Sequence, residues 1–114
     1  MKYLLLIYGN VTRDEVAALS EDDQKALYAD WGAINNTPGV TPGTEMEDPS
    51  AATTIRVESG ETLVTDGPFP QTKEALGGFF TFEADDLDAA IELAARVPAA
   101  RLGGAIEVRP IMEW

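Results

Sequence analysis

The residues best suited to chemistry in this sequence begin at Asp66. Asp66, Gly67 and Pro68 form a turn signal, because an aspartate side chain can bond the backbone that follows it and glycine accepts a positive φ. The Asp66 carboxylate could act as the general acid or base of a lyase, isomerase or hydrolase. It could equally cap the turn that it starts, and both interpretations remain open.

Other charged side chains offer binding rather than catalysis. Lys73 stands beside Glu74 and could bind an anionic group or form an ordinary surface ion pair. Glu107 and Arg109 alternate onto one face of a predicted strand, where they could meet a ligand or form a salt bridge. A guanidinium can orient a carboxylate through two parallel hydrogen bonds, so Arg109 is a candidate ligand contact.

The composition excludes several kinds of site. The 114 residues include no histidine and no cysteine, so haem, zinc, iron–sulfur clusters, a Ser-His-Asp triad and a cysteine nucleophile all lack their side chains. The carboxylates of Asp85, Asp86 and Asp88 lack the loop spacing of a calcium site and suit a helix start instead. We therefore expect no metal and no cofactor.

The charge balance also narrows the partners. The chain has 20 acidic and 8 basic residues, which gives a formal net charge of −12. Such a chain repels nucleic acid and anionic membrane surfaces, whose binding depends on lysine and arginine. The N-terminal apolar run is shorter than the roughly 7–15 residues of an export signal, and no segment approaches the roughly 18 of a membrane span. The sequence predicts one cytoplasmic domain over residues 1–114.

The elements that must position these residues follow from periodicity and turn signals. A continuous apolar run over residues 3–8 predicts a central strand covered on both faces. Residues 35–52 contain Pro38, Gly39, Pro42, Gly43 and Pro49 and predict a long loop, either a lid or a surface excursion. The other predicted elements are a short helix ending near Leu19, a helix after Ser20 whose apolar stripe is Leu27, Trp31 and Ile34, a hairpin over 53–65 with a Ser59-Gly60 turn, a strand over 77–83, a helix after Asp85 whose stripe is Leu87, Ala90, Ile91 and Ala94, and a strand over 105–109.

This order of elements predicts an α+β protein with the βαββαβ pattern of the ferredoxin-like fold. Its helices should cover one face of one antiparallel sheet. The other face would carry Phe79, tyrosines and the Glu107 and Arg109 pair, and an apolar surface of that size usually marks an interface. We therefore expect a homodimer in which the two sheets face each other.

Three stretches resemble the YCII-related family, and in particular its DGPF-motif branch: MKYLLLIYG, VTDGPFPQTKEALGGFF and IEVRPI. The resemblance implies a dimeric α/β barrel, in which two ferredoxin-like subunits enclose a cavity. Some members of this family have a catalytic His–Asp pair, but this chain has Asp30-Trp31 in the corresponding helix and Val97 before Pro98. That pair therefore cannot be transferred to this sequence.

The resulting hypothesis is a protein that binds a small organic ligand in an inter-subunit cavity without a cofactor. Asp66 is the catalytic candidate, and the expected ligand-binding residues are Gly67, Pro68, Phe69, Lys73, Phe79, Glu107 and Arg109. Two alternatives remain open: a cofactor-free enzyme that uses Asp66, and a protein-interaction module. The family resemblance links the second alternative to sigma-factor regulation.

Overall fold

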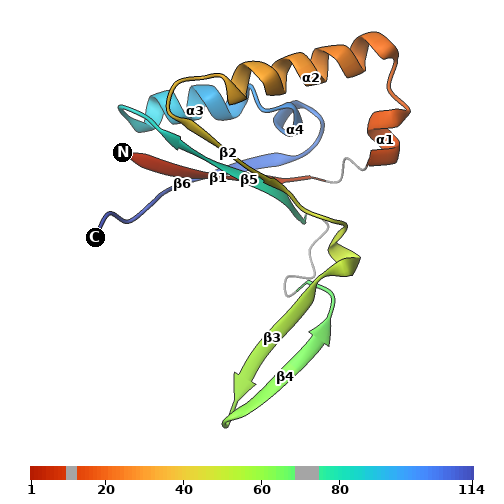
Figure 1. The fold of residues 1–114 in the computed structure, drawn as a ribbon, viewed down its shortest axis with the longest axis vertical. Coiled ribbons are helices and arrows are strands. Elements are labelled where there is room, and N and C mark those ends of the chain that lie inside the picture. The colour runs from red at the N-terminus through yellow and green to blue at the C-terminus, as the bar shows by residue number, and fades with distance from the viewer. Residues whose placement is uncertain (10–12, 69–74) are drawn as a thin grey trace.

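The structure is a computed structural model that describes residues 1–9, 13–68 and 75–114. Its main sheet is antiparallel, with the strand order β2-β5-β1-β6, and helices α2 and α3 lie over one of its faces (Figure 1). This α+β architecture is compatible with the predicted ferredoxin-like fold. The elements in chain order are β1 (Lys2–Tyr8), α1 (Arg13–Ala17), α2 (Glu21–Asn35), β2 (Val40–Glu45), the 3₁₀ turn η1 (Pro49–Ala51), β3 (Thr53–Glu58), β4 (Glu61–Asp66), β5 (Leu76–Glu83), α3 (Leu87–Ala95), α4 (Pro98–Arg101) and β6 (Ala105–Pro110).

Strand β1 occupies the centre of the sheet, as its continuous apolar run predicts. Leu5 lies opposite Phe80 of β5 on one side and Val108 of β6 on the other. These side chains face the helices, where the buried core forms. The fully or nearly buried apolar residues are Tyr3, Leu5, Ile34, Phe80, Phe82, Ala84, Ala90, Leu93, Ala94 and Val97.

The prediction of a long loop over residues 35–52 is wrong, because this segment contains strand β2 and turn η1. Pro42 and Gly43 are rare in strands, so the sequence does not predict this one. They lie where the register between β2 and β5 shifts, between Thr41 and Thr44. Proline is tolerated at such an irregularity on an edge strand because a missing N–H costs no ladder hydrogen bond there.

The predicted hairpin exists, but it belongs to a separate sheet rather than to the main one. Strands β3 and β4 pair only with each other, and they project from the main sheet on the side away from the helices (Figure 1). Ser59 and Gly60 have φ values of 50° and 78°, which are typical of the two-residue turn that connects hairpin strands with a right-handed twist. The second strand of the ferredoxin-like pattern is therefore β2, and the hairpin is an insertion after it.

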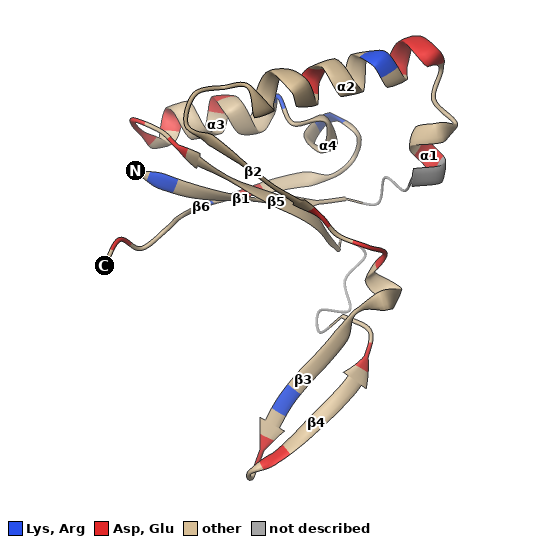
Figure 2. Ribbon diagram, viewed as in Figure 1, with Lys and Arg blue, Asp and Glu red and all other residues tan. Residues whose placement is uncertain are grey.

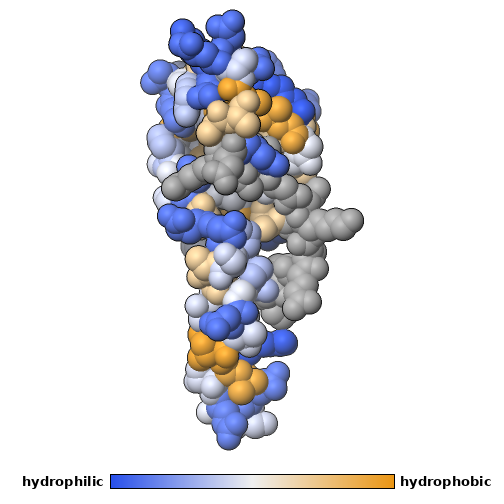
Figure 3. Space-filling view, turned by 90° about the vertical axis from the view of Figure 1, so that its right-hand side faces the viewer, coloured by the Kyte–Doolittle hydropathy of each residue, from blue (hydrophilic) through white to orange (hydrophobic). Residues whose placement is uncertain are grey.

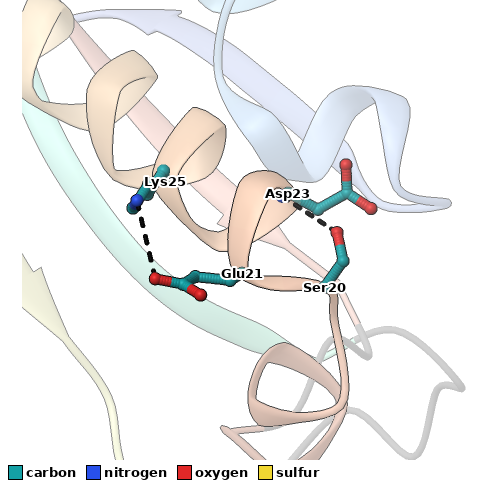
Figure 4. Close-up of polar contacts among 4 residues, drawn as sticks. All are labelled: Ser20, Glu21, Asp23 and Lys25. Carbon is teal, nitrogen blue, oxygen red and sulfur yellow. Dashed lines mark hydrogen bonds and ion pairs between the residues drawn. The ribbon is translucent and has the colours of Figure 1, made fainter.

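The helix predicted after Ser20 is confirmed as α2, and Ser20 is its N-cap. Ser20 Oγ accepts a hydrogen bond from the Asp23 amide at 3.1 Å, and Lys25 Nζ lies 3.5 Å from Glu21 Oε1 one turn along the helix (Figure 4). Figure 2 shows how acidic residues gather at the start of this helix, where they oppose its positive dipole end.

Helix α3 buries a different face from the one predicted. Ala90 and Ala94 are buried as expected, but Leu87 and Ile91 are 48% and 51% exposed. Leu93 and Val97 take their places in the core. None of the described helices combines the length and apolar character that a membrane span needs.

Candidate functional site

A hollow of about 760 Å³ lies between α2 and the helix-covered face of the main sheet. It opens at the end of the sheet where β1 and β2 finish and β5 begins. The described residues that line it are Ile7, Gly9, Val16, Ala17, Gln24, Leu27, Tyr28, Trp31, Asn35, Pro42, Gly43, Thr44, Glu45, Gly77, Gly78, Phe79, Phe80, Pro98, Ala99 and Leu102.

Helix α2 forms one wall of the hollow. Gln24, Tyr28, Trp31 and Asn35 recur at helical spacing, so one side of the helix presents them together. The Trp31 ring packs edge-to-face on Phe80, with ring centroids 6.2 Å apart and an angle of 82° between the planes. This contact holds one end of α2 against the sheet and fixes the orientation of the indole.

Small residues create the space on the opposite wall. Gly77 and Gly78 follow Leu76 at the start of β5, where β1 and β2 flank it, and Gly43 lies on the neighbouring edge strand. All three glycines are among the residues that line the hollow.

The polar groups around the hollow are few. Glu45 is the one charged side chain among the described lining residues, and it stays exposed to solvent. The Gln24 side-chain amide donates to the carbonyl oxygens of Leu19 at 3.0 Å and Ala17 at 3.3 Å, which ties α1 to α2. The described wall is thus mostly apolar and aromatic, with one anionic group and no described cation.

The sequence predicts an apolar stripe with Leu27 and Trp31 and a cavity between subunits, but not this hollow within one chain. Of the predicted site residues in the described part of the chain, Phe79 alone is among its lining residues. The signal was the polar pair Gln24 and Asn35 on the same side of the helix as the aromatic residues. A helix face that only packs in a core would not need amides at both ends. The glycines that line the hollow are present in the sequence. Gly43 could be placed near Gly78 only after β2 had been identified as a strand.

Asp66 lies elsewhere, at the last position of β4 where the hairpin returns to the body of the protein. Its side chain is exposed, and among the described residues none forms a hydrogen bond with its carboxylate. The turn after it is held by the backbone instead: Gly67 has a φ of 99°, its N–H donates to the Ala52 carbonyl at 2.7 Å, and its own carbonyl accepts from Thr54 Oγ1 at 2.7 Å. Pro68 follows as an exposed residue, while Phe69 and Lys73 lie outside the described residues.

Phe79, Glu107 and Arg109 share the face of the main sheet that the helices leave uncovered, which we call the open face. Phe79 lies opposite Leu6 and Arg109 lies opposite Leu4, so all four residues are on this face. Arg109 donates to Glu107 Oε2 at 2.8 Å along the same strand, and both side chains are well exposed. The predicted charge pair therefore exists as an ion pair on β6.

The structure does not bring Asp66 and Arg109 together within one chain. The hairpin follows β2, which forms one edge of the main sheet, and Arg109 is on β6, which forms the other. Three strand spacings separate these edges, or about 14 Å. No cluster of three or more carboxylates in the described part of the chain is arranged to hold a metal ion.

Comparison with known proteins identifies the family. Residues 1–114 match the YCII-related domain. The chain is also 32% identical over 116 residues to an uncharacterised protein of Rhizobium meliloti (strain 1021), a similarity that covers 97% of this chain and 92% of the relative. With the match spanning the main sheet, the inserted hairpin and the hollow alike, the chain belongs to the YCII-related family.

Proposed function

We propose that this YCII-related protein binds a small organic molecule that joins an apolar ring to an amine or another hydrogen-bond donor. The hollow under α2 carries this proposal. Its volume of about 760 Å³ lies within the range of small-molecule sites, which is roughly 300–1,000 Å³. Its mostly apolar wall with a few polar groups is also typical of such sites.

The charge of the preferred ligand follows from the wall. Glu45 would attract a cation, and the Trp31 and Tyr28 rings would add a favourable interaction with it. The net charge of −12 favours the same sign of ligand, because the field of the whole molecule raises the local concentration of cations. An anionic ligand would meet no described cation in this wall.

Two probes of matched shape test this proposal: 2-phenylethylamine and phenylacetate. Trp31 lines the hollow while Trp114 is fully exposed, so Trp114→Phe leaves one tryptophan as a local fluorescence reporter. We expect the amine to shift the Trp31 emission with an affinity at least tenfold higher than the acid. Glu45→Gln should remove this preference, and Glu92→Gln on the exposed side of α3 should not.

The absence of binding by both probes would contradict the proposal. A reduced affinity of the Ala99→Leu variant, whose larger side chain narrows the hollow, would support it independently of charge. That variant keeps Glu45 intact, so it separates the loss of space from the loss of the carboxylate.

We also propose that the chain forms a homodimer through its open faces, as in a dimeric α/β barrel, and that it belongs to the DGPF-motif branch. The apolar residues Leu4, Leu6 and Phe79 on the open face support the first statement. The residues Asp66 to Phe69 support the second.

The cavity between two open faces is the second proposed location for a ligand. Arg109 and Glu107 would contact the ligand there, and Asp66 would serve as a contact or as an acid or base. The same probes distinguish the two locations. Binding of phenylacetate that is lost in Arg109→Ala and kept in Glu45→Gln would assign the ligand to the inter-subunit cavity.

A further inference from the structure

The hairpin over residues 53–66, which we call the arm, has one apolar face. Ile55 lies opposite Val64 and Val57 lies opposite Thr62, so these residues point to the same side. Ile55, Val57 and Val64 are 56%, 66% and 63% exposed. Arg56, Glu58 and Glu61 belong to the other face. Figure 3 shows the apolar residues of the arm as a separate patch far from the body of the protein.

In the described part of the chain, the hydrogen bonds and the turn that fix the ends of the arm do not involve Ile55, Val57 or Val64. Its base is fixed by the Gly67 to Ala52 and Thr54 to Gly67 hydrogen bonds, and its tip by the Ser59-Gly60 turn. A two-stranded hairpin without further packing is only marginally stable in water. Three β-branched side chains on one side of it gain stability only when another surface covers them.

The direction of the arm indicates which surface that is. The arm leaves the sheet at the β2 edge and extends on the side away from the helices, which is the side of the open face (Figure 1). The arm and the open face therefore lie on the same side of the main sheet. A second copy of this chain carries the same two surfaces and can cover both of them at once.

The areas agree with this partner. An open face of four strands covers about 400 Å² and one face of the arm about 200 Å², given strands roughly 4.8 Å apart and a rise of roughly 3.3 Å per residue. A dimer through the open faces alone would cover a flat footprint of about 800 Å² in total. Two arms, each packed on the other subunit, add about 800 Å² and bring the total to the roughly 1,600 Å² of a stable complex.

We infer that the arm is a dimerisation element, which packs Ile55, Val57 and Val64 against the second subunit. This inference rests on the proposed homodimer. A two-fold axis parallel to the strands sets the β2 edge of each sheet opposite the β6 edge of the other, as a closed barrel requires. The arm that follows β2 then lies beside β6 of the other subunit, so Asp66 and Arg109, which one chain keeps apart, approach each other across the interface.

The oligomeric state of an arm variant tests this inference. Ile55→Thr, Val57→Thr and Val64→Thr together keep branched side chains and strand propensity while removing apolar surface. We expect sedimentation velocity to show a dimer dissociation constant at least a hundredfold higher than that of the unmodified protein. Leu63→Thr, on the other face of the arm, should change it by less than threefold.

The outcomes separate this inference from the functions proposed above. Equal dimer affinity in the triple variant would overturn the role of the arm and leave the homodimer intact. A monomeric unmodified protein at high concentration would overturn both, and the probe titrations would still report on the hollow, which lies within one chain.

Site-specific cross-linking tests the same contact without weakening it. The chain has no cysteine, so Val57→Cys and Glu58→Cys each provide a single attachment point for a benzophenone maleimide. These neighbours point to opposite faces of the arm. We expect illumination to yield a covalent dimer from the label at position 57 at least fivefold more efficiently than from position 58. Cross-links within one chain, or equal yields, would contradict the inference.

Discussion

Gly43 lies where the edge strand β2 crosses closest to its neighbour. A Cβ atom at this position would stand 1.7 Å from the carbonyl oxygen of Phe79, and the next nearest atoms also belong to the backbone. No rotation of a side chain can relieve such an overlap. The backbone approach at this single residue is what allows β2 to follow β5 past the register shift at Pro42.

Gly43→Ala should therefore destabilise the protein by about 3 kcal/mol, because a strand must move to admit one methyl group. Gly32→Ala is the matched control: no heavy atom lies within 4 Å of the Cβ that it would add on α2. Alanine is the better helix former by about 1 kcal/mol, so this control should stabilise the fold. Urea unfolding of both variants measures the two effects, and equal effects would refute the steric argument.

Asp48 caps turn η1 and has a distinct response to pH. The Ser50 amide donates to its carboxylate at 2.9 Å, and this hydrogen bond, followed by that of the Ser50 side chain, lowers the pKa of Asp48 below its ordinary value. A lowered pKa in the folded state means that the cap contributes at neutral pH and is lost as the pH falls through that lowered pKa. The Ser50 amide resonance should accordingly titrate below the usual aspartate range, and Asp48→Ala should abolish this titration.

At the scale of elements, the helices and the hairpin follow from local signals, whereas β2 does not. Ser20 and Asp86 cap α2 and α3 through hydrogen bonds that the sequence predicts, and Ser59-Gly60 turns the hairpin. Strand β2 depends on β5 for its conformation, since Pro42 and Gly43 have low strand propensity and are accepted only at an edge irregularity. The residues of β2 therefore do not predict the strand by themselves, because a contact with a distant part of the chain determines its conformation.

The same distinction explains the outcome for the candidate site. The placement of Phe79, Glu107 and Arg109 on one face follows from strand alternation and is confirmed. The hollow under α2 could not be predicted, because its walls come from α2, β2 and β5 and depend on where β2 lies in the sheet. The roles of Asp66 and of the ligand-binding candidates stay predictions.

Removal of the α2 cap provides a test at this scale. Ser20→Ala leaves the Asp23 amide without its side-chain acceptor and should destabilise the protein by about 1 kcal/mol. Because the lost hydrogen bond lies in the first turn of α2, hydrogen exchange of the amides there should rise more than in the core strands. Lys25→Ala should have a smaller effect, since its exposed ion pair with Glu21 contributes roughly 0.3–0.5 kcal/mol. An equal loss from both variants would contradict the importance of the cap.

At the scale of the whole molecule, charge opposes assembly. Two subunits with a formal net charge of −12 each repel one another, and Figure 2 shows acidic groups at the tip of the arm and along the helices. Salt screens this repulsion over a Debye length of about 10 Å at 0.1 M. The dissociation constant of the proposed dimer should therefore fall as sodium chloride is raised from roughly 20 to roughly 300 mM, two concentrations on either side of 0.1 M. Sedimentation equilibrium at the two salt concentrations measures the change, and weaker association at high salt would indicate an interface held by ion pairs.

The central position of β1 also determines the order in which the protein can fold. Both neighbours of this N-terminal strand come from the second half of the chain, at residues 76–83 and 105–110. During synthesis the apolar run of β1 must therefore wait, without strand partners, until residues 76–83 have left the ribosome. The hairpin closes locally within microseconds, whereas the main sheet needs loop closure across most of the sequence. The main sheet can thus be completed only after residues 105–110 have been synthesised.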